Sequence, residues 1–203
     1  MLLIYKVSQP VSKRHPCSDV RYDRAESMQD MALDIRGVEQ LSPEEIQYLF
    51  GWGENIFDTA HLNLTYRPKD SRDRRFVLYE AQVPVSHAGV LQHHAHANGR
   101  RALIGGVGGV VTVPGARRRG HAGRLLRHAA AFLRDEWKVD FALLFCIDQR
   151  VGFYQRLEWA EVSCEVLIDQ PTGRVPCPFH VMALPFKPEF SRIEALDLGS
   201  PSW

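Results

Sequence analysis

The sequence predicts an α/β domain with a mixed, mostly antiparallel twisted sheet that is flanked by helices. Three consecutive segments, 76–82, 86–96 and 101–113, combine apolar and β-branched residues in the manner of strands. An Asn-Gly pair at 98–99, between the second and third segments, is a strong hairpin signal. From residue 117 the hydrophobic period changes from two residues to about 3.6, which predicts an amphipathic helix over 117–136.

The elements before this block follow in order. Residues 31–38 are expected to form the first core strand, and residues 41–57 a helix. Ser42 is suited to cap that helix, because its side chain can accept a hydrogen bond from the backbone N–H of Glu45. Pro43 would then occupy the first helical position, where its missing N–H costs nothing.

The second half of the chain alternates between strands and helices. The continuous apolar run 140–147 is typical of a buried strand. Residues 149–157 are expected to form a short helix, and residues 161–168 and 178–184 late strands. Strands and helices in this order predict a mixed sheet with helices packed on it.

Length and composition indicate one domain with extensions. We divide the 203 residues into an N-terminal extension (1–30), a folded domain (31–186) and a C-terminal tail (187–203). The 25 Lys and Arg nearly balance the 24 Asp and Glu, which argues against a general nucleic-acid or membrane-surface binder. The four cysteines show no C-x-x-C spacing, and no apolar run approaches the roughly 20 residues of a spanning helix. We therefore expect a reduced, cytoplasmic protein with no membrane partner.

The segment 111–126, VTVPGARRRGHAGRLL, places three arginines where a strand gives way to a helix. The start of a helix presents free backbone N–H groups and the positive end of the helix dipole, so anions bind there. Gly120 lets a ligand approach the backbone, and guanidinium groups match the geometry of phosphate.

Three interpretations of these arginines compete: a solvated charge cluster, a nucleic-acid patch and a phosphate-binding loop. Positive charge at a helix start is unfavourable unless an anion or an acid offsets it. The gap from Gly115 to Gly120 matches a nucleotide P-loop, but His121 and Ala122 replace the required Lys and Ser or Thr. The glycines at 105–109 do not complete a dinucleotide fingerprint. The segment therefore predicts a cradle for a pyrophosphate group.

Two motifs in this half resemble the GNAT superfamily of N-acetyltransferases. The pattern Arg117-x-x-Gly120-x-Ala122, with Val-Pro before it and a Leu pair after it, is similar to that family's acetyl-coenzyme A motif. The segment FYQRLEW at 153–159 is similar to its second motif, with Glu158 where a glycine is common. The resemblance covers about 101–168 and implies a GNAT-like acyl-CoA N-acyltransferase fold with acetyl-CoA as cosubstrate.

The resemblance also implies roles for individual residues. The backbone of Val111, Thr112 and Val113 would pair with the pantetheine arm, and an amide near Val113 would polarise the thioester oxygen. Tyr154 would act as general acid toward the departing thiolate. The pyrophosphate would be held by residues at the helix start: Arg118, Arg119, Gly120, His121, Ala122, Gly123 and Arg124.

A narrower similarity is to the aminoglycoside 2′-N-acetyltransferases, through SHAGVLQHH, FYQRLEW and a short tail ending in Trp. That group carries a glutamate on the strand before the cradle, thought to relay a proton from the amine, and Gly109 stands at the matching position here. Candidates for the missing proton acceptor are Glu80, His93, His94 and His96, and the sequence does not choose among them. No metal site is expected, because His94 and His96 share a strand face but lack further ligands.

The expected function is transfer of an acetyl group from acetyl-CoA to a primary amine of a small molecule. An aminoglycoside or a polyamine is a candidate acceptor. The alternative function is that of a non-catalytic GNAT-like domain that binds a CoA thioester. This alternative stays open because Gly109 stands where the family's proton-relaying acid is expected. We expect no nucleic-acid partner, and a homodimer is one possible assembly.

Overall fold

The computed structural model describes residues 31–37, 40–52 and 64–203. The predicted N-terminal extension, 1–30, lies outside these described residues, as do residues 53–57 of the predicted helix 41–57. That helix was predicted too long, because it ends at Phe50 with Gly51 as its C-cap. The predicted cap of that helix is confirmed. In α1 (Pro43–Phe50), the Ser42 side chain accepts from the Glu45 N–H and the Glu45 carboxylate accepts from the Ser42 N–H.

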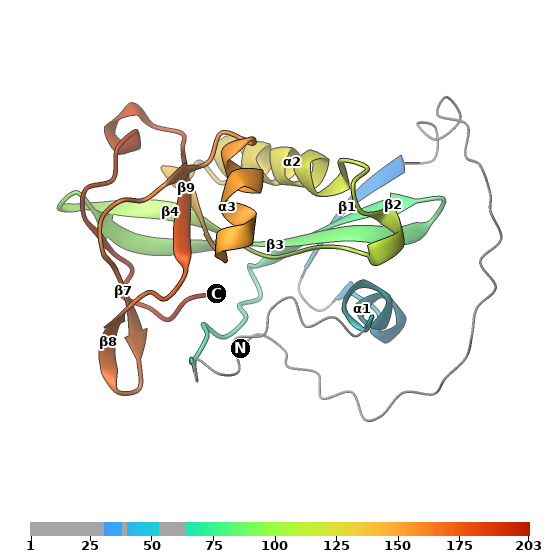
Figure 1. Ribbon diagram of the computed structural model, residues 1–203, viewed down its shortest axis with the longest axis horizontal. Coiled ribbons are helices and arrows are strands. Elements are labelled where there is room, and N and C mark those ends of the chain that lie inside the picture. Colours follow the sequence, from blue (N-terminus) through green and yellow to red (C-terminus); the bar gives the residue numbers. More distant parts are fainter. Residues whose placement is uncertain (1–30, 38–39, 53–63) are drawn as a thin grey trace.

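One mixed sheet forms the body of the molecule (Figure 1). Its antiparallel part runs through β1 (Met31–Gly37), β2 (Arg74–Glu80), β3 (Val83–Ala97) and β4 (Arg100–Thr112). β4 pairs in parallel with β5 (Phe141–Cys146), which continues antiparallel to β9 (His180–Pro185) and then β6 (Ala160–Glu161). On the other side, β3 also pairs with β10 (Leu196–Asp197), followed by β7 (Val166–Gln170) and β8 (Gly173–Pro176). The sheet curls into a half-barrel of the GNAT acyl-CoA N-acyltransferase type, as predicted.

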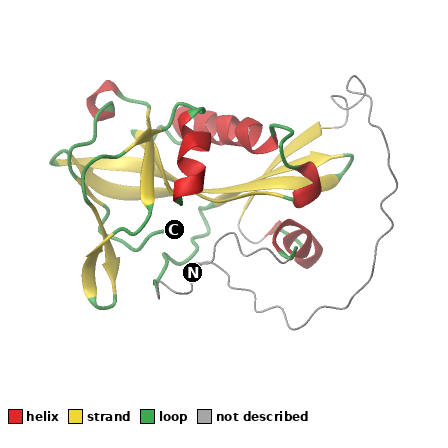
Figure 2. Cartoon of the chain, viewed as in Figure 1, coloured by secondary structure: helices red, strands yellow, loops and turns green. Residues whose placement is uncertain are grey.

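The helices cover both faces of this sheet (Figure 2). α2 (His121–Asp135) packs on β2, β3 and β4 through a stripe of buried residues, among them Leu125, Leu126, Ala129 and Leu133. α1 lies on the opposite face, and α3 (Asp148–Gln155) follows β5. No described helix is long and apolar enough to cross a membrane.

The structure confirms the predicted hairpin between β3 and β4 but not the predicted first residue of α2. The Asn-Gly hairpin between β3 and β4 is confirmed, with φ of 51° at Asn98 and 72° at Gly99. The prediction that α2 begins at residue 117 was wrong, because the helix starts at His121. Arg118 and Gly120 adopt left-handed φ values of 62° and 82°, which no continuous right-handed helix allows. The arginines therefore lie in a turn after the short 3-10 helix η4 (Pro114–Ala116).

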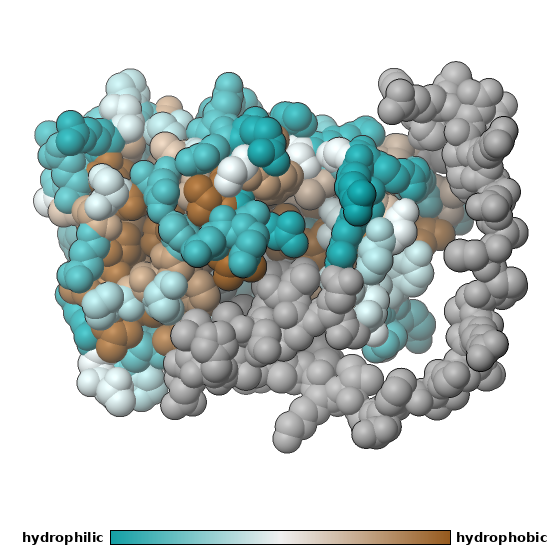
Figure 3. Space-filling model, in the orientation of Figure 1, coloured by the Kyte–Doolittle hydropathy of each residue, from teal (hydrophilic) through white to brown (hydrophobic). Residues whose placement is uncertain are grey.

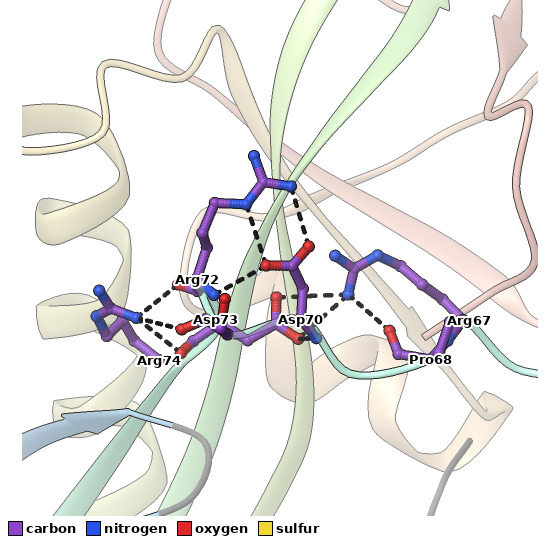
Figure 4. Close-up of polar contacts among 7 residues, drawn as sticks. Arg67, Pro68, Asp70, Arg72, Asp73 and Arg74 are labelled. Atoms are coloured by element: carbon purple, nitrogen blue, oxygen red, sulfur yellow. Dashed lines mark hydrogen bonds and ion pairs between the residues drawn. The ribbon is translucent and has the colours of Figure 1, made fainter.

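The residues that we expected to form a tail supply β10 and lie against the sheet. The side chain of Asn98 accepts from the Glu194 N–H at 2.8 Å. Near the last residue, the Arg67 N–H donates to the Ser202 carbonyl at 2.8 Å. The loop around Arg67 is itself fixed, because the buried Asp73 carboxylate accepts from the Arg67 guanidinium at 3.2 Å, within a network of arginines and aspartates (Figure 4). The end of the chain is thus held on the sheet face opposite α2.

Candidate functional site

The two parallel strands at the centre of the sheet separate along their length. β4 pairs with β5 only over Ile104–Val107 and Phe141–Leu144. Beyond this ladder β4 continues to Thr112 and β5 continues to Cys146. Among the described residues, the last part of β4 therefore has no strand partner on the side of β5. An unpaired edge offers backbone donors and acceptors to an extended ligand.

Three hydrogen bonds show which backbone groups of β4 face β3 instead. His87 Nδ1 donates to Gly109 O at 2.7 Å, Ser86 Oγ donates to Val111 O at 2.7 Å, and Val113 N–H donates to Val85 O at 3.0 Å. Backbone groups alternate along a regular strand, so those of Thr112, between Val111 and Val113, face the open side, whereas the bulge between Gly108 and Val111 interrupts this alternation at Val110. Arg117 Nε donates to Thr112 O there, at 3.3 Å. Of the three residues predicted to pair with pantetheine, Thr112 is the one whose backbone faces the gap.

The start of α2 follows η4 and the arginine turn, and no described side chain caps it. The first-turn N–H groups, those of His121, Ala122 and Gly123, have no intrahelical acceptor. The N-cap, Gly120, has φ 82°, and a Cβ placed on it would meet no atom within 4 Å. This combination of free donors and open space is the geometry that binds phosphate at helix N-termini.

The four arginines around the start of α2 differ in whether another described side chain engages them. Arg117 stacks on the Trp52 ring at 4.7 Å from its centroid, and Arg119 forms an ion pair with Glu80. Arg118 and Arg124 are exposed and have no partner among the described residues. The loop appears in Figure 3 as a strip of hydrophilic residues. Two guanidinium groups are therefore free to meet an anion, while the other two fix the loop.

Tyr154 lies near the end of α3, beside the diverging strands. The residue is 7% exposed, and its ring packs edge-on against Trp159, at 6.3 Å between centroids. Burial raises the pKa of the phenol above its usual value, so the hydroxyl keeps its proton at neutral pH. Leu157, just after α3, contacts the first turn of α2, where a Cβ on Gly123 would lie 3.4 Å from its Cδ2. Tyr154 and the helix start thus belong to neighbouring elements.

The opposite face of β4 is covered by Trp203. A Cβ on Gly106 would lie 2.5 Å from Cε2 of that indole, so the ring lies directly on the strand. Trp203 also packs on Phe145, at 4.9 Å between centroids. Phe145 in turn contacts Phe179, which lines a cavity of about 300 Å³ together with Glu161, Glu165, Cys164, Cys177 and His180 among others.

None of the four side chains predicted as proton acceptors makes a described contact with Gly109. Glu80 is held in its ion pair with Arg119. His93 Nε2 donates to Leu198 O at 2.7 Å, and His94 and His96 are exposed toward the β3–β4 hairpin. The described residues contain no group of three or more potential ligands that could hold a metal ion.

The histidine that does contact Gly109 is His87, which the sequence analysis missed. It is fully enclosed by the protein, and its ring packs edge-on against Phe50 of α1 at 5.1 Å between centroids. No sequence signal distinguishes His87 from the other histidines of SHAGVLQHH. Only the register of β3 against the bulged end of β4 brings it to that position.

A family model described as an acetyltransferase (GNAT) domain matches residues 44–162. Among solved structures, Escherichia coli ElaA is 14% identical, covers 76% of this chain and 99% of its own, and has a TM-score of 0.50. A variant of the spermidine N-acetyltransferase SpeG from Vibrio cholerae is 15% identical over 76% of this chain and 94% of its own, with a TM-score of 0.50. These identities indicate a shared fold.

A third structure matches over a shorter span. A GCN5-related N-acetyltransferase from Kribbella flavida is 23% identical over 43% of this chain, with a TM-score of 0.40. The match spans only 22% of the length of that protein. No curated protein sequence matches the chain.

Proposed function

Because the chain belongs to the GNAT acetyltransferase family, whose model covers residues 44–162 of 203, we propose that it transfers an acetyl group from acetyl-CoA to a primary amine of a small molecule. One observation carries the proposal. Within the described residues, the open edge of β4 is followed by η4, the arginine turn and an uncapped helix start, with the guanidinium groups of Arg118 and Arg124 unpartnered. An extended arm that ends in a pyrophosphate fits this arrangement.

The donor would lie along β4 as an added strand. The backbone of Thr112 faces the gap, and with that of Val110 in the bulge it would pair with the pantetheine amides. Val111 and Val113, whose backbone groups bond to β3, would hold that edge in place. The pyrophosphate would be bound by the N–H groups of His121, Ala122 and Gly123, by the open surface at Gly120, and by Arg118 and Arg124, with Arg119 fixed on Glu80.

Acetyl-CoA supplies an activated acetyl group as a thioester. Holding donor and amine side by side supplies much of the rate acceleration. As the amine nitrogen bonds to the carbonyl carbon and the C–S bond breaks, a backbone N–H on the open edge of β4 would stabilise charge on the carbonyl oxygen, since the N–H of Val113 is engaged with Val85 O. Tyr154 gives its proton to the sulfur as general acid, and the amine's surplus proton leaves to solvent.

The acceptor would enter from the face of β4 that Trp203 and α1 share. The cavity of about 300 Å³ on this side is lined by the exposed Glu165, which favours a cationic amine, and by Glu161, which is paired with His180. One solved relative by fold is a spermidine N-acetyltransferase, which also has a cationic acceptor. We therefore propose a polyamine or an aminoglycoside as the acceptor class.

Release of CoA thiol in the presence of a panel of primary amines tests the proposal. We expect spermidine, kanamycin or a similar amine to accelerate thiol release from acetyl-CoA, with the acetylated amine detected by mass spectrometry. If acetyl-CoA binds but no amine accelerates release, the chain is a CoA-thioester-binding domain without catalysis, and the proposed function is wrong.

A further inference from the structure

β1 lies at one edge of the antiparallel part of the sheet (Figure 1). Its seven residues pair with β2 along their whole length, from Met31 opposite Glu80 to Gly37 opposite Arg74. Among the described residues, β1 has no strand partner on its other side. Backbone N–H and C=O groups that point to that side can form a ladder with a further strand, so such an edge is a site for pairing between chains.

β1 lacks two of the features that keep edge strands from pairing. It contains no proline, and it runs along β2 without a shift in register. Ile35, in the middle of the strand, is 44% exposed. A strand added beside β1 would cover this side chain and remove apolar area from water.

The two charged side chains of β1 have opposite signs and share one face, because they are two residues apart. Arg36 Nε donates to Asp34 Oδ2 at 2.7 Å, and Arg36 Nη1 donates to Glu45 Oε2 at 3.0 Å. Arg36 Nη2 and Asp34 Oδ1 make no hydrogen bond to a described residue, and the Asp34 side chain is 45% exposed. Each group thus keeps one atom for a partner on a neighbouring strand.

A second copy of β1 fits this charge pattern in one register. Two identical antiparallel strands related by a twofold axis place one residue opposite itself. With Asp34 or Arg36 at the axis, a charge would face its own copy, which destabilises a strand pair. With Ile35 at the axis, Asp34 of one copy lies opposite Arg36 of the other, and the two Ile35 side chains meet on the opposite face.

We propose that the chain forms a homodimer in which the two β1 strands pair antiparallel, with Ile35 on the twofold axis. The ladder would cover residues 33–37 of each copy and join the two sheets into one. The 25 Lys and Arg nearly balance the 24 Asp and Glu, so little net charge opposes the association of two copies. The proposal does not depend on the proposed function, because it concerns an edge of the sheet away from β4.

Sedimentation equilibrium of the full chain tests the proposal through two charge reversals. In Asp34→Arg, the new side chain would face Arg36 of the other copy, and in Arg36→Asp it would face Asp34. Each variant alone should raise the dimer Kd on the order of 10-fold or more, because two attractive pairs per dimer become repulsive. An equimolar mixture of the two variants should form a heterodimer with a Kd within about 3-fold of that of the wild type, since opposite charges face each other again.

The mixture also separates the loss of pairing from a loss of folding. Arg36→Asp removes the partner of Glu45 within its own chain, which can lower the stability of the monomer. A misfolded variant would not regain association when mixed with the other variant. Ile35→Lys leaves both charged residues of β1 in place, puts two like charges at the axis and should also dissociate the dimer.

Asp135→Arg is the matched control, because it makes the same charge change in an exposed ion pair on α2, with Arg134. Its dimer Kd should equal that of the wild type. The proposal is overturned by a wild type that stays monomeric at its highest soluble concentration. It is also overturned by a dimer that Ile35→Lys leaves intact, or by a mixture of the two charge-reversed variants that forms no heterodimer.

Discussion

Individual arginines of the cradle differ in what they can do for the donor. Arg117 and Arg119 are engaged with Trp52 and Glu80, and Arg118 and Arg124 have exposed guanidinium groups without a described partner. We therefore expect Arg118→Ala and Arg124→Ala each to raise the Kd of acetyl-CoA about 10-fold, as loss of a charge-assisted hydrogen bond should. Calorimetry at low and moderate salt measures this, and Arg101→Ala at the distant hairpin is the control. If all three substitutions raised the Kd equally, the cause would be a general loss of positive charge, and the specific roles of Arg118 and Arg124 would be contradicted.

Tyr154 is the residue proposed to protonate the leaving thiolate. Replacing it with Phe removes the hydroxyl and keeps the packing against Trp159. We expect kcat to fall by roughly 100-fold or more while the Kd of acetyl-CoA and the melting temperature stay the same. Steady-state kinetics beside a thermal melt measure this, with the exposed Tyr48→Phe as the matched control. An unchanged kcat would remove Tyr154 from the mechanism.

At the scale of elements, the start of α2 carries the donor site. Gly120→Ala adds a methyl group at φ 82°, which costs on the order of 1 kcal/mol of stability, and places that group where the pyrophosphate would lie. Gly99→Ala has a similar φ of 72° and equally open surroundings, but lies at the far hairpin. Both variants should lose similar stability in urea titrations, and only Gly120→Ala should weaken acetyl-CoA binding. A similar loss of binding in Gly99→Ala would contradict a specific site.

The sequence predicted those elements whose signal is local. Alternation and the Asn-Gly pair identify β2, β3 and β4, and the 3.6-residue period identifies α2. Its start was misplaced because left-handed φ values at Arg118 and Gly120 leave no trace in hydrophobicity. β10 is two residues long, too short for any periodicity, and it exists because β3 and β7 offer it partners.

At the scale of the whole molecule, the site depends on contacts between distant segments. Glu80 meets Arg119, Trp52 meets Arg117, and His87 meets Gly109. No sequence pattern predicts such contacts, because they arise from strand register and from the packing of α1 against the sheet. The candidate donor site, being one continuous segment, could be predicted, whereas the acceptor face could not.

The buried His87 also links stability to pH. Its pKa is about 3 in the folded state and near 6.5 when unfolded, so the unfolded chain binds the extra proton between these values. Stability should therefore fall as pH decreases through this window, by up to about 1.4 kcal/mol per pH unit from this residue. Urea unfolding at several values between pH 4 and 7 should give a steeper decline for the wild type than for His87→Asn. Parallel curves would contradict the burial of a neutral imidazole.

The most direct test of the central claim is a crystal structure of the protein with acetyl-CoA. The pantetheine arm should lie along the edge of β4 at Val110 and Thr112, on the side where β5 diverges. The pyrophosphate should lie on the N–H groups of His121, Ala122 and Gly123, within reach of Arg118 and Arg124. A donor bound elsewhere, such as in the cavity beside Phe179, or no bound donor at saturating concentration, would contradict the account.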